Sequence, residues 1–397
     1  MPEIGEVARV VHYLRKHLVG KTLASVKVQD DTNVYNKVGT TAAEFQKGMV
    51  GKKVLDARQQ GKYFWLVMSA PPHGLFHLGM TAWIKFSNED TTYYRSGNGA
   101  EEAWPPKYWK FILETKEEPK CQAAFVDSRR FGRIRLLDCD QTKIRQVPPL
   151  SENGPDPVQD RELVTKDWFV QKVRSKKVPV KAFLLNQANL SGVGNWVGDE
   201  ILYHAKIHPE QYTDSLRDAQ LVQLHKSLHH ICTIAVDTLA DSNAFPAEWL
   251  MKYRWGKGKK DNKLPNGNKI IFLTVGGRTS AVVPSVQKKT GPVAGDFDAD
   301  EVDSEDLDES TGIKDEGQTK NAAKHAAKPI QSARHAETKK TSSGKVSPPV
   351  KSPSTKKRKA AGAAKGNGVA ADERPKADNN LKLSSPPDTT VSPTAFY

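Results

Sequence analysis

The chain has 397 residues and a formal net charge of +14, and a chain of this length can hold two or three domains. It contains no run of about 18 consecutive apolar residues, which argues against a membrane-spanning helix. Its 3 cysteines are an odd number without a CxxC spacing, which argues against a disulfide scaffold and a cysteine zinc site. A reducing intracellular compartment is the simplest setting.

The excess positive charge lies almost entirely before residue 291. Residues 291–397 hold 17 Lys/Arg and 16 Asp/Glu, and removing them from totals of 60 and 46 leaves a net charge of +13 for residues 1–290. A basic folded region usually meets a polyanion such as nucleic acid. A solubilising surface explains the same charge equally well.

The first part of the chain predicts a helix followed by β-structure. Apolar residues at three- and four-residue steps predict a helix over residues 4–18, which Gly20 ends. Short apolar or alternating runs in residues 22–138 predict a β-sandwich or barrel packed against that helix. Four prolines in residues 146–160 predict an interdomain hinge.

The next part predicts helices and then a hairpin. The helices are expected at residues 167–174, 180–186, 195–205 and 218–240. Residues 270–274 and 279–284 are expected to pair as strands around a Gly-rich turn.

The tail, residues 291–397, has a composition that predicts disorder. It holds only three aromatic residues, and an acidic block at residues 296–309 precedes Ala-, Lys-, Ser- and Pro-rich sequence. Such a segment buries too little apolar surface to offset its ordering entropy. The basic cluster Lys356–Lys359 resembles a nuclear import signal, so we expect the protein in the nucleus; a generic basic tail is the alternative.

The N-terminal residues carry the first chemical signal. Removal of Met1 would leave Pro2 with a free secondary amine, followed at once by Glu3 and Glu6. Attack of this amine on a sugar C1′ gives an iminium that keeps its positive charge and acts as an electron sink. In the simpler interpretation, Pro2 only starts a helix and the two carboxylates complement the helix dipole.

A second signal precedes the helix expected at residues 195–205. Gly192 and Gly194 allow tight turns and close backbone approach. A helix N-terminus with such an entry is suited to binding phosphate, although an ordinary cap by Asn195 fits the same residues.

Five motifs in this order resemble the formamidopyrimidine-DNA glycosylase family, which includes the endonuclease VIII-like enzymes. They are Pro2-Glu3, Gly61-Lys62-Tyr63, His77–Met80, Asp127–Gly132 and Gly192–Asn195. The resemblance implies a monomeric, bifunctional DNA repair enzyme without a cofactor. Such an enzyme excises oxidised bases from duplex DNA and then cleaves the abasic strand by β- and δ-elimination.

We expect an α+β fold with five parts, of which the resemblance implies the sandwich, the DNA-binding domain and the finger, and the composition predicts the linker and the tail. These are an N-terminal catalytic β-sandwich with a leading helix (residues 1–145), a linker (146–164), a helix–two-turn–helix DNA-binding domain (165–255), a zinc-free β-hairpin finger (256–290) and the disordered tail (291–397). The partners of the tail stay open.

The resemblance assigns four residues to catalysis. Pro2 is the expected nucleophile, and Glu3 the general acid/base near the sugar. Lys62 is expected to assist β-elimination. Arg278, at the tip of the finger, is expected to contact the phosphates that flank the flipped sugar and to take part in δ-elimination.

The remaining site residues are expected to bind DNA. Met80, Arg129 and Phe131 match the residues that fill the void left when the damaged nucleotide is extruded. The other expected contacts are His77 with the backbone, Lys176 and Asn195 with phosphates, and Glu200 near the lesion.

The sequence departs from the family pattern at two points. Residues 256–290 contain no cysteine, whereas the bacterial finger holds zinc with four, so no metal is expected. Gly5 stands where a proline is usual, which is expected to loosen the start of the first helix.

Two questions stay open. Formamidopyrimidine and hydantoin lesions are favoured over 8-oxoguanine, and oxidised pyrimidines stay open as an alternative substrate. A non-catalytic nucleic-acid-binding protein with the same helical fold is the alternative to an enzyme, although the presence of Pro2, Glu3 and Lys62 favours the enzyme.

Overall fold

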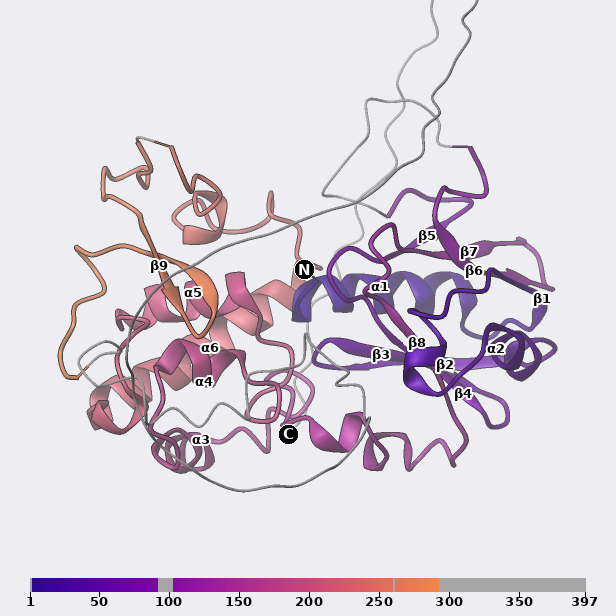
Figure 1. Cartoon of the computed structure of the whole chain (residues 1–397), viewed down its shortest axis with the longest axis horizontal. Coiled ribbons are helices and arrows are strands. Elements are labelled where there is room, and N and C mark those ends of the chain that lie inside the picture. The colour runs from indigo at the N-terminus through magenta and orange to yellow at the C-terminus, as the bar shows by residue number, and fades with distance from the viewer. Residues whose placement is uncertain (1, 92–102, 260, 293–397) are drawn as a thin grey trace, which may run out of the picture. The chain divides into compact units, whose positions relative to one another are not determined.

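The computed structural model describes residues 2–91, 103–259 and 261–292 (Figure 1). The predicted tail therefore lies outside the described residues, apart from its first two positions. The described helices are α1 (Ile4–Leu18), α2 (Ala42–Met49), α3 (Lys166–Arg174), α4 (Val180–Leu185), α5 (Asn195–Ala205) and α6 (Asp218–Asp237). None of them is long and apolar enough to cross a bilayer.

Strands occupy most of the first part of the chain. They are β1 (Leu23–Val28), β2 (Val54–Gln60), β3 (Tyr63–Met68), β4 (His73–His77), β5 (Trp83–Phe86), β6 (Trp109–Thr115), β7 (Gln122–Val126) and β8 (Arg133–Leu137). In the described residues they form two antiparallel four-stranded sheets, in the orders β1-β6-β7-β5 and β2-β3-β4-β8. One apolar core holds side chains of both sheets, such as Phe125 and Phe64, which confirms the predicted β-sandwich.

Helix α1 connects this core with a second one. Val7, Val11 and Leu14 pack into the core of the sandwich, whereas Ile4 belongs to the core formed by helices α3 to α6. Figure 1 shows the first turn of α1 beside α5 and α6 and the rest of the helix along the strands. The N-terminal residues therefore lie where the two cores meet.

Gly5 allows α1 to pack closely on α6. A Cβ at this position would stand 2.5 Å from the carbonyl oxygen of Ala235, which is closer than real Cβ contacts. The expectation that Gly5 loosens the helix start is therefore wrong, because its missing side chain permits a tight backbone contact.

The predicted helices are confirmed with small shifts at their ends. The largest shift is in α6, which ends at Asp237 rather than residue 240, because Leu239 and Ala240 adopt left-handed backbone angles. The stretch before α3 is held by an ion pair in which Asp160 accepts two hydrogen bonds from Arg145.

The predicted hairpin is also confirmed. Strands β9 (Ile271–Val275) and β10 (Arg278–Val282) pair antiparallel, with Val275 opposite Arg278. Gly276 and Gly277 form the two-residue turn, and both have positive φ, as the tightest hairpin turns require.

Candidate active site

Glu3 is buried at the N-terminus of α5. Its side chain is 2 % exposed, and its two oxygens accept hydrogen bonds from the backbone N–H groups of Trp196 and Val197, each at 3.0 Å. These N–H groups have no partner within the helix. The sequence predicted a phosphate or the Asn195 side chain as the acceptor for these N–H groups. In the structure the acceptor is the Glu3 carboxylate.

Gly194 makes this contact possible. A Cβ on Gly194 would stand 2.2 Å from the carboxyl carbon of Glu3, so any other residue would displace the Glu3 side chain. The need for glycine at this position therefore comes from the carboxylate that lies against it.

Glu6 fixes the backbone that leads to Pro2. One oxygen of Glu6 accepts the backbone N–H of Glu3 at 3.0 Å, and the other accepts the indole N–H of Trp196 at 3.0 Å. The N–H of Glu3 belongs to the peptide bond that joins Glu3 to Pro2, so these contacts fix the peptide that follows the half-buried Pro2. Glu6 thus braces the helix start.

Lys62 lies in the turn between β2 and β3, close to the same helix end. A Cβ on Gly61 would stand 2.6 Å from the backbone nitrogen of Gly192, and the carbonyl of Gly192 accepts the N–H of Ile4 at 3.1 Å. The loop before α5 thus contacts both the Lys62 turn and the start of α1. Lys62 itself is 9 % exposed.

Asp156 holds the Lys62 turn from the other side. Its carboxylate is fully buried, and one oxygen accepts the backbone N–H of Gly61 at 2.7 Å. Burial raises the pKa of Asp156. The role of Asp156 was not predictable from the local sequence, because its partner Gly61 lies 95 positions away along the chain.

Asn195 joins α5 to the hairpin. Its side-chain amide donates to the carbonyl of Thr279 at 2.9 Å, the residue that follows the exposed Arg278 in β10. Its Oδ1 is buried without a partner in the described part of the chain. The structure therefore links two predicted phosphate contacts, Asn195 and Arg278.

Met80, Arg129 and Phe131 lie on two adjoining loops. A Cβ on Gly79 would stand 2.4 Å from the carbonyl oxygen of Phe131, so the loops touch through their backbones. The Arg129 guanidinium lies 5.0 Å from the centre of the Phe131 ring, which is 46 % exposed. The structure thus brings the three predicted void-filling residues together.

Asp127 holds the second of these loops in shape. It is 1 % exposed, and its oxygens accept the backbone N–H groups of Arg129 at 3.1 Å and Gly132 at 2.7 Å. The motif that contains Asp127 was recognised in the sequence, but its buried carboxylate was given no role there.

His77 is a neutral hydrogen-bonding residue. Burial, with the nearby charges of Lys62, Arg133 and Arg135, lowers the pKa of His77 to about 3. Its Nδ1 accepts the N–H of Gly79 at 3.1 Å, so the proton is on Nε2, which can donate to DNA. A contact of His77 with the DNA backbone would thus be a hydrogen bond and not an ion pair.

Glu200, which was predicted to lie near the lesion, anchors the chain after α6. The side chain is fully buried, and its oxygens accept the backbone N–H groups of Leu250 at 3.1 Å and Met251 at 2.7 Å. Burial raises the pKa of Glu200. The carboxylate is therefore bonded inside the protein, and its nearness to the lesion stays a prediction.

Lys176 is exposed just after α3.

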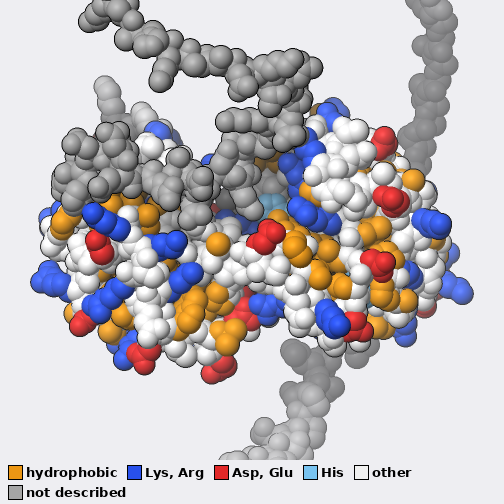
Figure 2. Space-filling view, turned by 60° about the horizontal axis from the view of Figure 1, so that its bottom comes forward, with side chains coloured by type: hydrophobic (Ala, Val, Ile, Leu, Met, Phe, Trp, Pro, Cys, Tyr) orange, Lys and Arg blue, Asp and Glu red, His pale blue; other side chains and the backbone are white. Residues whose placement is uncertain are grey.

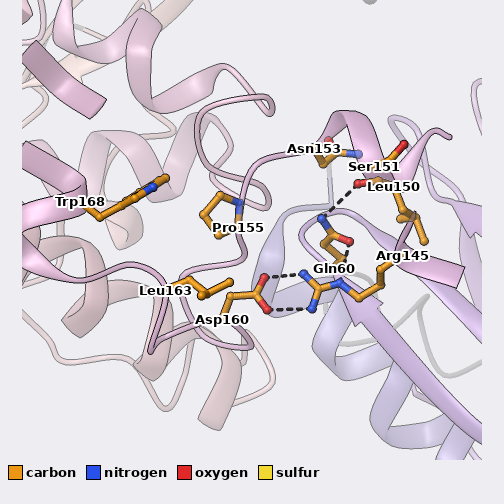
Figure 3. Close-up of a pocket in the computed structure, with 9 residues that line it drawn as sticks. All are labelled: Gln60, Arg145, Leu150, Ser151, Asn153, Pro155, Asp160, Leu163 and Trp168. Atoms are coloured by element: carbon orange, nitrogen blue, oxygen red, sulfur yellow. Dashed lines mark hydrogen bonds and ion pairs between the residues drawn. The ribbon is translucent and has the colours of Figure 1, made fainter. Parts of the chain in front are cut away.

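One cavity of the described residues is lined by none of the predicted site residues. It has a volume of about 510 Å³ and is lined by Gln60, Arg145, Leu150, Ser151, Asn153, Pro155, Asp160, Leu163 and Trp168 (Figure 3). The Arg145–Asp160 ion pair crosses it. Figure 2 shows Lys and Arg side chains gathered beside a separate hollow near the middle of one face, with a histidine at its floor.

The finger region does not fit a zinc ion. Zinc in proteins is held by cysteine, histidine and carboxylate side chains, and residues 256–290 contain neither cysteine nor histidine. Across the described ranges, no group of three or more His, Cys, Asp or Glu residues could hold a metal.

Comparisons with known proteins agree with this architecture. The formamidopyrimidine-DNA glycosylase N-terminal domain matches residues 1–134, and the H2TH domain of the same enzymes matches residues 153–246. A formamidopyrimidine-DNA glycosylase of Arabidopsis thaliana is 38% identical over 292 residues, 73% of this chain and 72% of the relative. One of Pediococcus pentosaceus is 30% identical over 238 residues, 60% of this chain and 78% of the relative.

A solved structure shows the same fold. The Lactococcus lactis Fpg, in its complex with abasic site containing DNA, matches with a TM-score of 0.58 and 25% identity, covering 72% of this chain and 100% of that chain. Together with the two matching domains and the Arabidopsis relative, this likeness shows that the chain belongs to the formamidopyrimidine-DNA glycosylase family.

Proposed function

We propose that this DNA glycosylase of DNA repair is bifunctional, and that the nitrogen of Pro2 is its nucleophile. The observation that carries the proposal is the meeting of three groups at one helix end. Glu3 lies on the N-terminus of α5, the Lys62 turn contacts the loop that precedes α5, and Glu6 fixes the peptide that follows Pro2.

The chemistry consists of base displacement, ring opening, two eliminations and a final hydrolysis. The Pro2 nitrogen bonds to C1′ while the bond from C1′ to the base breaks, and the base leaves with the proton that this nitrogen gives up. Opening of the sugar ring then gives the iminium, with Glu3 donating a proton to O4′. Loss of a C2′ proton, assisted by Lys62, expels the 3′ phosphate, and loss of the C4′ proton expels the 5′ phosphate. Water then hydrolyses the remaining iminium and frees Pro2.

The substrate is duplex DNA with an oxidised base or an abasic site. Extruding the nucleotide costs about a few kcal/mol, and Met80, Arg129 and Phe131 fill the space that it leaves. The exposed Phe131 ring can enter the base stack, while Arg129 can donate to the orphaned base. Formamidopyrimidine and hydantoin lesions are the substrates we favour.

The setting of the protein is part of the proposal. The basic cluster Lys356–Lys359 supports nuclear import, and we propose that the enzyme acts there as a monomer. The hairpin is the zinc-free form of the family's finger, because its residues offer no ligands suited to zinc.

A matched pair of full-length preparations tests the nucleophile. One has Met1 removed so that Pro2 is the N-terminus, and the other carries an extra Gly-Ser before Pro2, which turns the amine into an amide. We expect the first to cleave an abasic duplex and the second to bind the same duplex without cleaving it. Equal cleavage by both would refute Pro2 as the nucleophile. Binding without cleavage by both would favour the non-catalytic alternative.

A further inference from the structure

The β9–β10 hairpin needs support from outside itself. A two-stranded hairpin alone is marginally stable in water, and the residues of this finger do not suit a zinc ion. The apolar cluster beneath it is small, with Leu250, Leu264, Ile270, Ala281 and Val283 as its buried members. Polar contacts from other segments must therefore help to fix the strands.

A buried carboxylate joins the hairpin to three other segments. Asp199 of α5 is 1 % exposed, and one of its oxygens accepts the backbone N–H of Ala281 in β10 at 3.0 Å. The same oxygen accepts from Arg254 at 2.6 Å, and the other accepts from Lys181 of α4 at 2.5 Å. Lys181, Asp199 and Arg254, which we call the anchor cluster, are all less than a tenth exposed.

Asp199 is the ion-pair partner of both cations of the anchor cluster in the described residues. Burial lowers the pKa of Lys181, and the charges of Asp199 and Glu3 oppose this shift. Lys181 also donates to the carbonyl of Asn195 at 2.6 Å. Because a buried cation without its partner is strongly unfavourable, removal of the Asp199 carboxylate is expected to destabilise the positions of both Lys181 and Arg254.

The anchor cluster lies close along the chain to two predicted phosphate contacts, Arg278 and Asn195. Arg278 begins β10, three positions before Ala281, whose N–H Asp199 accepts. Between them, the carbonyl of Thr279 accepts from Asn195. Two bonds from α5, one to Thr279 and one to Ala281, therefore hold β10.

We propose that Asp199 is a positioning residue for DNA binding: with Lys181 and Arg254 it forms a buried ionic anchor that fixes the β9–β10 hairpin, and thereby sets where Arg278 meets a phosphate of the damaged strand. The inference rests on the proposed function, since it takes Arg278 as a phosphate contact. It adds that the place of this contact is set by a carboxylate that never touches DNA.

A double-mutant cycle tests the inference. Affinity for a duplex with a tetrahydrofuran abasic analogue is measured over a range of salt concentrations for the full chain, Arg278→Ala, Asp199→Asn and the double variant. Loss of one phosphate contact lowers the slope of log K against log salt by about one unit. We expect the slope to fall by about one unit in each single variant. In the double variant it should fall no further than in Arg278→Ala alone.

Two further variants separate positioning from stability. Arg254→Gln leaves Asp199 paired with Lys181, so it serves if Asp199→Asn does not fold, and we expect it to reduce the slope in the same non-additive way. Asp160→Asn is the matched control, because it removes the charge of another buried carboxylate, whose ion-pair partner Arg145 is partly exposed. Its effects on affinity are expected to add to those of Arg278→Ala.

Each contrary outcome has a distinct meaning. Additive effects of Asp199→Asn and Arg278→Ala, or an unchanged slope in Asp199→Asn, would overturn the positioning role. An unchanged slope in Arg278→Ala would overturn it as well, by showing that Arg278 does not bind phosphate. Cleavage of abasic DNA by the same preparations reports separately on the proposed Pro2 chemistry.

Discussion

Replacing Gly194 with alanine perturbs the proposed active site by a single methyl group. The new Cβ would stand 2.2 Å from the carboxyl carbon of Glu3 and 2.5 Å from its Oε1, so the side chain must leave the N-terminus of α5. Overpacking of this kind costs about 1–3 kcal/mol. The loss of a hydrogen bond to a charged group costs about 1.5–3 kcal/mol more.

The effect on catalysis follows from the role of Glu3. Positioned general acid/base groups contribute about 10²–10⁴-fold to a rate, and displacement of Glu3 should cost base excision a large part of this factor. Single-turnover excision from a duplex with a formamidopyrimidine lesion measures the loss, and thermal unfolding measures the change in stability.

Gly48→Ala in α2 is the matched control. A Cβ at this position meets the ends of the Leu136 and Pro72 side chains at 3.0 and 3.1 Å, which can shift, so normal excision is expected. A wild-type excision rate and an unchanged melting temperature in Gly194→Ala would refute the reasoning.

The remaining predictions concern pH, a buried carboxylate and the tail. Because the pKa of His77 falls from 6.5 to about 3 on folding, the unfolded chain binds a proton that the folded chain does not. Stability should therefore fall as pH drops from 6.5 towards 3, by up to about 1.4 kcal/mol per pH unit, and urea titrations of the chain and His77→Gln should show the difference. Glu200→Gln should lower the melting temperature and leave the salt slope of DNA binding unchanged; a reduced slope would identify Glu200 as a DNA contact. A chain ending at residue 292 should keep its cleavage activity and lose nuclear uptake, as enzyme assays and imaging of a tagged chain would show.

Elements with a clear local pattern were predictable from the sequence. The apolar stripe of residues 4–18 and the Gly-Gly turn of the hairpin both depend on neighbouring residues, and both elements were found where expected. The motifs also identified loops that the structure brings together, such as those of Met80 and Phe131.

Contacts between distant segments were not predictable in this way. Glu3 binds the N-terminus of α5 through hydrogen bonds to residues 193 and 194 positions away. The sequence predicted that Gly194 lets a phosphate approach this helix end, whereas in the structure Gly194 leaves room for the Glu3 carboxylate. The bonds of Glu200 to Leu250 and Met251 were not predictable either, because these residues lie 50 and 51 positions away along the chain. Gly5 was misjudged because its contact with Ala235 joins distant segments. Asp199 was missed because its partner Ala281 is also distant along the chain.

Trapping with borohydride tests the central claim most directly. Reduction of the enzyme during its reaction with an abasic duplex should give one protein–DNA crosslink, and peptide mapping by mass spectrometry should place it on the nitrogen of Pro2. A crosslink on Lys62 or any other lysine, or a fully active preparation that retains Met1, would contradict the account.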